Sequence, residues 1–239
     1  MIDDLKISSK VNHSFNETGS DSPNACLNKT YFKNYPYQIT YQYNSRGFRD
    51  DEWPNDLKNA IWCIGDSYTA GIGSPIENTW HRILRNKTQY NTISISMDGA
   101  SNDWISRRAV QVLNFIQPKF LVILWSFINR RESIDISLPD EDRRIWAIER
   151  ATDDDDLQNF VNNRNKVLSC LGNTSFADAA IPKFSVKRVV KTKPKFKTAD
   201  MHWMGEVKQL DVARDSIHFD KISAEIFANT ISSKLGFVV

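Results

Sequence analysis

A serine in a turn bounded by glycines and a histidine near the end of the chain have the residue types and surroundings best suited to chemistry. Ser67 lies in the sequence Gly-Asp-Ser-Tyr-Thr-Ala-Gly at 65–71, directly after an apolar run. A serine hydroxyl is a weak nucleophile at neutral pH and needs a neighbouring base. Asp215 precedes His218 by three residues, so its carboxylate can accept the Nδ1 proton and leave Nε2 to accept the proton of Ser67. These residues predict acyl transfer through a serine nucleophile.

The other three histidines of the chain are less suited to act as the base. They are His13 in a polar N-terminal stretch, His81 in a predicted helix where a surface position is usual, and His202 in a segment without a clear pattern. Two plainer interpretations stay open. Ser67 could simply cap a helix, and His218 could be a solvated loop histidine.

Apolar runs and helical spacing predict the elements that must position these side chains. Buried strands are predicted at 60–64, 91–96 and 120–125. Helices are predicted at 79–85, 104–116 and 220–235, and the spacing at 157–171 is compatible with another. Strands that alternate with helices imply right-handed crossovers and a parallel sheet. We therefore expect an α/β fold, a three-layer α/β/α sandwich around a central, mostly parallel sheet.

The N-terminal part of the chain shows little periodicity. Residues 1–35 are polar and rich in Asn and Ser, which predicts an arm or an irregular lid rather than core. Residues 37–43 alternate like a half-exposed strand. We divide the chain into an N-terminal arm with a strand and turn, 1–58, and an α/β domain, 59–239.

Composition narrows the classes of function. The 239 residues are 41% hydrophobic and 25% charged, as in a folded soluble protein, and a net charge of +2 argues against nucleic-acid or membrane binding. Cys26, Cys63 and Cys170 are widely spaced and show no metal-ligand pattern, which favours a reducing compartment. No signal peptide or membrane span is recognisable, so we expect a cytoplasmic protein. The sequence leaves the oligomeric state open.

Three candidate site residues follow the three predicted strands. Ser67 follows the first strand, Gly99 the second and Asn129 the third. Ligands of parallel α/β sheets bind at the carboxyl ends of the strands. The three residues are therefore expected to share one edge of the sheet.

These motifs resemble those of the SGNH (GDSL-type) hydrolases. The heptapeptide at 65–71 resembles the family's GDSxTxG signature, and 215–218 resembles its DxxH element. Gly99 and the three residues after it resemble the second block of the family. The resemblance covers about residues 60–130 and 210–236 and marks 59–239 as an SGNH-like hydrolase domain with a flavodoxin-like sheet.

The resemblance implies a role for each matched residue and needs no metal or organic cofactor. Ser67 is the expected nucleophile, His218 the base and then the acid, and Asp215 the residue that orients His218. The oxyanion would be held by the backbone N–H groups of Ser67 and Gly99 and by the side-chain amide of Asn129. Asp66, by contrast, is expected to hold the serine loop by accepting backbone N–H bonds.

The third block departs from the family pattern. The family shows Gly-x-Asn-Asp, whereas this chain has Phe-Ile-Asn-Arg at 127–130. Either the loop is rebuilt, with Asn102 a weaker substitute donor, or catalysis is weakened or lost. The first hypothesis is therefore a serine esterase or deacylase acting on a small-molecule or carbohydrate ester, with O-acetylated carbohydrate suggested by the resemblance. The alternative is a catalytically silent domain that binds a glycan or a protein partner.

Other motifs point less clearly to a function. Residues 43–50 resemble a segment found in some members that act on acylated polysaccharides, but they also fit a turn with an apolar contact to the sheet. The basic residues between 183 and 197 fit a solvated edge better than a surface for an acidic substrate. An α/β-hydrolase elbow would need glycine at position 69, where the chain has Thr69. Residues 71–74 are no P-loop, because no Gly-Lys-Ser/Thr follows.

Overall fold

The computed structural model describes residues 2–16, 21, 39–145, 153–181, 209–215 and 217–237. At its centre is a four-stranded sheet in the order β4-β3-β5-β8, in which all neighbouring strands pair in parallel. Its strands are β3 (Ile61–Gly65), β4 (Thr92–Ser96), β5 (Phe120–Trp125) and β8 (Ser175–Ala180). Two short antiparallel pairs lie outside it: β1 (Ser14–Phe15) with β2 (Tyr41–Gln42), and β6 (Arg131–Glu132) with β7 (Arg144–Ile145).

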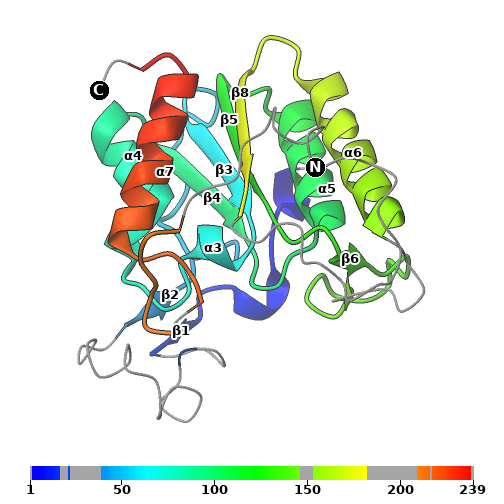
Figure 1. Ribbon diagram of the computed structural model, residues 1–239, viewed down its shortest axis with the longest axis horizontal. Helices are drawn as coiled ribbons and strands as arrows, with labels where there is room; N and C mark the ends of the chain where they lie inside the picture. Colours follow the sequence, from blue (N-terminus) through cyan, green and yellow to red (C-terminus); the bar gives the residue numbers. More distant parts are fainter. Residues whose placement is uncertain are drawn as a thin grey trace.

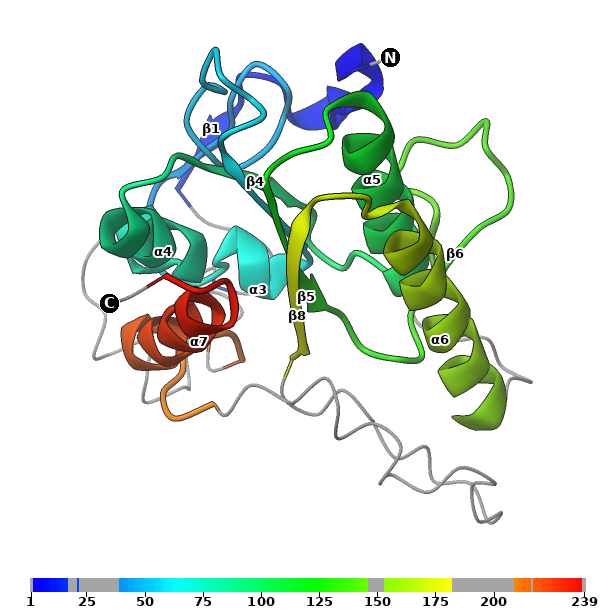
Figure 2. The ribbon, with the colours of Figure 1, turned by 90° about the horizontal axis from the view of Figure 1, so that it is seen from above.

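Helices cover both faces of the central sheet (Figures 1 and 2). One face carries α4 (Trp80–Thr88) and α7 (Lys221–Lys234), and the other carries α5 (Asn102–Phe115) and α6 (Asp153–Cys170). The single-turn helix α3 (Ser67–Ala70) follows β3. Three 3-10 turns complete the described elements: η1 (Ile2–Asp4), η2 (Ser8–Lys10) and η3 (Ile76–Asn78). The predicted three-layer α/β/α sandwich is confirmed.

The central strands β3 and β5 are apolar on both sides because both faces of the sheet are covered. In β3, Ile61 and Cys63 pack in the cluster that contains α4 and α7. Trp62 and Ile64 point the other way, into the cluster that contains α5. This alternation follows from the two-residue period of a strand. Burial also raises the pKa of the Cys63 thiol well above its ordinary value, so Cys63 is an inert core residue, as its position in an apolar run predicts.

The fourth strand, β8, was not predicted from the sequence. Apart from Phe176, its residues are small or polar rather than β-branched, so they give no apolar run. Asp178 points inward from it and accepts hydrogen bonds from Nε1 of Trp125 at 3.1 Å and from Nε of Arg164 at 2.6 Å. An edge strand can carry an inward-facing charge when the charge is paired. The same charge interrupts the apolar pattern from which a strand is predicted.

The expectation that the first 35 residues lie outside the core is wrong for Leu5 and Ile7. Both are buried in the cluster on the α5 face, together with Phe48. The backbone N–H of Ile7 donates to the carbonyl of Arg46 at 2.9 Å, which fixes this segment against the turn before β3. Two isolated apolar residues between 3-10 turns produce no periodicity. The domain boundary near residue 58 stays a prediction.

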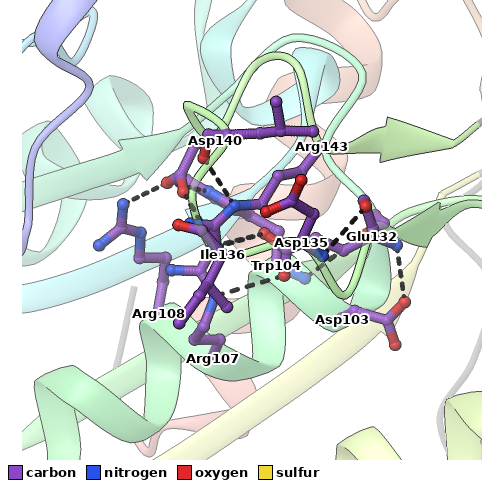
Figure 3. A network of polar contacts seen from close by, with 12 residues as sticks. Asp103, Trp104, Arg107, Arg108, Glu132, Asp135, Ile136, Asp140 and Arg143 are labelled. Atoms are coloured by element: carbon purple, nitrogen blue, oxygen red, sulfur yellow. Dashed lines mark hydrogen bonds and ion pairs between the residues drawn. The ribbon is translucent and has the colours of Figure 1, made fainter.

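The segment that joins β5 to β7 is fixed to α5 by a polar network (Figure 3). Asp140 accepts from Nε1 of Trp104 at 2.8 Å and forms ion pairs with Arg107 and Arg108. Glu132 also pairs with Arg107. Burial acts to raise the pKa of Asp140, but the two guanidinium groups and the Trp104 N–H outweigh it and hold this pKa below its ordinary value. The network anchors the segment that follows the predicted third block.

A membrane-spanning helix would need a longer apolar stretch than any helix in the described ranges provides.

His81 is not on the surface, contrary to the expectation for its helix. Its side chain is fully buried on α4, and neither ring nitrogen reaches a hydrogen-bond partner among the described residues. Burial lowers the pKa of His81 well below its ordinary value, and the charges of Arg82, Arg49 and Arg85 lower it further, against an opposing effect of Asp51. The folded protein therefore holds this imidazole neutral.

We expect His81→Leu to make the protein less sensitive to acid. In the wild type, the unfolded chain takes up a proton at His81 below about pH 6.5 and the folded chain does not. This contribution to stability is complete above that pH and is lost as the pH falls, by about 1 kcal/mol at pH 5.5. Urea unfolding of both proteins between pH 7.5 and 5.5 measures the difference. Parallel stability curves would contradict it.

Candidate functional site

The strand-to-helix turn after β3 holds Ser67 in a buried position. Asp66 is the N-cap of α3, and its Oδ1 accepts from the backbone N–H of Tyr68 at 3.0 Å, which confirms the expected structural role of this carboxylate. A β-carbon at Gly65 would lie 2.1 Å from Oγ1 of Thr69, so only glycine allows the helix to turn back so closely. The turn places Ser67 at the carboxyl end of β3, where it is 1% exposed.

The loop before α7 brings the distant histidine to this serine. Nε2 of His218 lies 2.7 Å from Oγ of Ser67, and Nδ1 of His218 lies 2.5 Å from Oδ2 of Asp215. The other oxygen of Asp215 accepts from the backbone N–H groups of Ile217 at 3.0 Å and His218 at 3.1 Å. A carboxylate, an imidazole and a hydroxyl thus form one continuous chain of hydrogen bonds.

Asp215 stays ionised in its buried position. Burial acts to raise the pKa of this carboxyl group, but the hydrogen bond and charge of His218 and the N–H groups of the loop outweigh it and hold the pKa below its ordinary value. An ionised Asp215 accepts the Nδ1 proton. The tautomer that results leaves Nε2 able to accept the proton of Ser67.

Tyr68 and Phe219 restrict the orientation of the imidazole. The ring of Tyr68 lies with its centroid 4.7 Å from that of His218, and Phe219 packs edge-on against Tyr68 at 4.9 Å. The hydroxyl of Tyr68 donates to the carbonyl of Ile217 at 3.1 Å. Burial raises the pKa of Tyr68, as do the charges of Asp66 and Asp215, so the hydroxyl stays protonated and keeps this bond.

The sheet register places the other two predicted site residues at the same edge. Gly65 at the end of β3 pairs with Ser96 of β4 and with Leu124 of β5. Gly99 lies in the turn after β4 with φ +71°, and Asn129 lies half-buried in the turn after β5. Their role in binding an oxyanion stays a prediction.

Asn102, the weaker substitute donor, is used structurally. Its side-chain oxygen accepts from the backbone N–H of Ser126 at 2.8 Å, and its Nδ2 donates to the carbonyl of Ser126 at 3.1 Å and to that of Phe127 at 3.4 Å. Both ends of the amide therefore hold the loop after β5 against α5. Such an arrangement argues against Asn102 as an oxyanion donor.

Arg130, which departs from the family pattern, forms an ion pair within the serine block. Its Nη1 lies 2.9 Å from Oδ2 of Asp66, and the same carboxylate oxygen accepts from Oγ of Ser126 at 2.6 Å. Asp66 is fully buried, and the side chain of Arg130 is 11% exposed. The loop after β5 is thus joined by a charge pair to the residue that precedes Ser67. The substitution is visible in the sequence, but the partner of the new charge is not.

We expect Arg130→Met to destabilise the protein by about 3 kcal/mol, because it leaves the buried Asp66 carboxylate without its counter-charge. Arg130→Lys is the matched control and should lose less, because it keeps the positive charge. Urea unfolding at neutral pH compares the three proteins. A methionine variant as stable as the wild type would show that Asp66 does not need this partner.

The segment at 43–50 is a turn that also supports the serine loop. Oδ1 of Asn44 accepts from the N–H groups of Arg46 at 3.0 Å and Phe48 at 3.1 Å, which fixes the turn. Arg49 is fully buried and donates from Nη1 to the carbonyl of Ala70 at 2.9 Å and from Nη2 to that of Ser74 at 2.8 Å. The turn therefore holds the chain that leaves α3. An arginine in a loop gives no sequence signal for such a contact.

Several other features of the chain lie away from this site or outside the described residues. A cleft of about 660 Å³, lined by Thr40, Gln42, Asp51 and Glu77 among others, contains none of the three residues of the Ser67 chain. Within the described ranges, no three His, Cys, Asp or Glu side chains gather as a metal would require. His202 and the basic stretch at 183–197 lie outside the described residues.

No family model and no curated protein matches the chain. Solved structures do match it. A lipolytic protein of the G-D-S-L family from Desulfitobacterium hafniense is 15% identical with a TM-score of 0.49, over 74% of this chain and 99% of the other. A family two carbohydrate esterase from Clostridium thermocellum, in complex with cellohexaose, is 13% identical with a TM-score of 0.48, over 77% and 67% of the chains.

The periplasmic domain of a lipopolysaccharide acetyltransferase from Salmonella Paratyphi A is 13% identical with a TM-score of 0.43, over 76% of this chain and 85% of the other. At these identities a likeness concerns the fold. We therefore base the proposed function on the side chains of this chain.

Proposed function

We propose that this chain is a serine hydrolase of the SGNH type that cleaves carboxylic esters through an acyl-enzyme. The observation that carries the proposal is the hydrogen-bond chain from Asp215 through His218 to Ser67, with distances of 2.5 and 2.7 Å. Ser67 lies far from Asp215 and His218 in the sequence. It meets them at the carboxyl edge of a parallel sheet, where such folds bind ligands. A helix cap or a solvated histidine would not need this arrangement.

In the proposed reaction, Oγ of Ser67 attacks the ester carbonyl carbon while His218 takes the serine proton at Nε2. The tetrahedral intermediate collapses as that proton passes to the departing alcohol, which leaves the acyl group on Ser67. Water then attacks the acyl-enzyme with His218 again as base, and the acid is released. Asp215 holds the imidazole and stabilises its cationic form without itself taking a proton.

The negative charge on the carbonyl oxygen needs hydrogen-bond donors. We assign this role to the backbone N–H groups of Ser67 and Gly99 and to the side chain of Asn129, which share the edge of the sheet. Loss of one such donor typically lowers the rate by about 10²- to 10³-fold. The ion pair between Arg130 and Asp66 supports the rebuilt third block beside them.

The substrate is proposed to carry a short acyl group. Ser67 is 1% exposed and His218 is 6% exposed, a degree of burial that favours the approach of a small acyl group over a bulky one. An acetyl ester, such as that of an O-acetylated carbohydrate, fits this restriction. A cytoplasmic location stays the sequence-based prediction.

The rebuilt third block favours a second candidate, a catalytically silent domain of the same fold that binds a glycan or a protein. Hydrolysis of p-nitrophenyl acetate by the wild type and by Ser67→Ala separates the two. A wild-type rate far above that of the variant, and above that with p-nitrophenyl octanoate, would support a short-chain esterase. Equal rates in the two proteins would leave only the binding function.

A further inference from the structure

The loop that follows Ser67 and the loop that carries Asp215 meet at Gly73. This glycine has φ +81°, and a β-carbon there would lie 2.9 Å from Cβ of Ala213 and 3.2 Å from Cγ of Asp215. The backbone N–H of Arg214 donates to the carbonyl of Gly73 at 3.0 Å. Glycine thus allows the two backbones to approach more closely than any other residue could. The relative position of the proposed nucleophile and carboxylate depends on this contact.

A buried polar cluster from the N-terminal part of the chain covers the contact. The hydroxyl of Tyr41 accepts from the N–H of Gly73 at 2.7 Å and donates to Oδ2 of Asp21 at 2.6 Å. The same oxygen of Asp21 accepts from Nη2 of Arg214 at 2.7 Å. Asp21 and Tyr41 are fully buried, and Arg214 is 5% exposed. One carboxylate is thus bonded to both loops, through Tyr41 on one side and Arg214 on the other.

We propose that Asp21 is a positioning residue that holds the loop of Asp215 against the loop of Ser67 through Arg214 and Tyr41, an inference that rests on the proposed function. Arg214 directly precedes Asp215, so a shift of its backbone moves the carboxylate that orients His218. Misplacement of a catalytic group by about 1 Å can lower a rate on the order of 10²-fold. Asp21 and Tyr41 therefore set the geometry of the reacting residues through their bonds to Arg214 and Gly73.

Two features make this cluster sensitive to the loss of one member. Burial raises the pKa of Tyr41, as does the neighbouring Asp21 carboxylate, so the hydroxyl stays a donor. Removal of the carboxylate charge would take away the negative charge that lies 2.7 Å from Nη2 of the buried Arg214, which is unfavourable. We expect the Arg214 loop to move toward solvent as a result.

The test compares the reaction of a fluorophosphonate probe with Ser67 in the wild type, Asp21→Asn and Tyr41→Phe. The maximal inactivation rate should fall by about 10- to 100-fold in Asp21→Asn, with a smaller fall in Tyr41→Phe and little change in the apparent affinity of the probe. The double variant Asp21→Asn/Arg214→Gln should recover part of the rate, because it removes the buried positive charge together with the carboxylate that faces it. Circular dichroism and melting curves confirm that each protein is folded at the assay temperature.

Asp178→Asn is the matched control, because it also neutralises a buried carboxylate that is paired with an arginine, but on the opposite side of the sheet. It should lose stability and keep the labelling rate. The inference is overturned if the wild type labels at Ser67 and Asp21→Asn labels equally fast, or if Asp178→Asn slows labelling by as much as Asp21→Asn does. A wild type that does not label at Ser67 would instead overturn the proposed function.

Discussion

Ser67→Ala is expected to lower the hydrolysis of p-nitrophenyl acetate by on the order of 10⁴-fold or more. The substitution removes only the Oγ atom that lies 2.7 Å from Nε2 of His218, and without it no acyl-enzyme can form. Because Ser67 lies within α3, where alanine is a good helix former, we expect the variant to remain folded. Initial rates at saturating substrate, with a melting curve for each protein, measure the effect.

Ser94→Ala is the matched control. Its hydroxyl is buried in β4 and hydrogen-bonded to that of Ser96 at 3.1 Å, well within the strand. This variant should keep the wild-type rate. A Ser67→Ala protein that is folded and loses less than about tenfold in rate would contradict a nucleophilic role for this residue.

Asp215→Asn is expected to lower the same rate by about 10³- to 10⁴-fold. The asparagine keeps an oxygen for the N–H groups of Ile217 and His218, which would orient its NH₂ group toward Nδ1. An NH₂ group donates to Nδ1 and so favours the tautomer with the proton on Nε2. His218 can then no longer accept the proton of Ser67.

Asp211→Asn tests whether a general disturbance of this loop explains the loss. Asp211 lies four residues earlier, and its carboxylate accepts from the backbone N–H groups of Ile222 and Ser223 at the start of α7. We expect this variant to be less stable and to keep most of its activity. Equal loss in both variants would mean that Asp215 acts on the structure of the loop rather than on the tautomer of His218. The pH is held above 7 so that Asp215 of the wild type is ionised.

It could be predicted that Ser67, Asp215 and His218 lie together, because they occur in short motifs next to elements with clear apolar patterns. Ser67 follows a strand that is apolar throughout, and His218 precedes a helix with an apolar face. The order of strands and helices then predicted that the carboxyl ends of the strands lie at one edge of the sheet, beside each other. The structure brings the serine, the histidine and the aspartate together as that order implies.

The features that the sequence did not predict depend on contacts between segments that lie far apart in the chain and show no periodicity of their own. The burial of Leu5 and Ile7 and the polar cluster of Asp21, Tyr41 and Arg214 join an apparently irregular N-terminus to the α/β domain. Isolated polar residues carry no periodicity, so their partners appear only in three dimensions. The full burial of His81 was also missed, because a single histidine in a short helix gives no sign of what packs against it.

In the proposed mechanism, the imidazole of His218 activates the hydroxyl of Ser67. Reaction with a fluorophosphonate, followed by peptide mapping, measures this directly, because the probe forms a stable adduct with an activated serine. We predict an adduct on the peptide that contains Ser67 in the wild type, and a rate lower by on the order of 10³-fold or more in His218→Ala. An adduct on another residue, or equal labelling of Ser67 in the two proteins, would show that His218 does not activate Ser67.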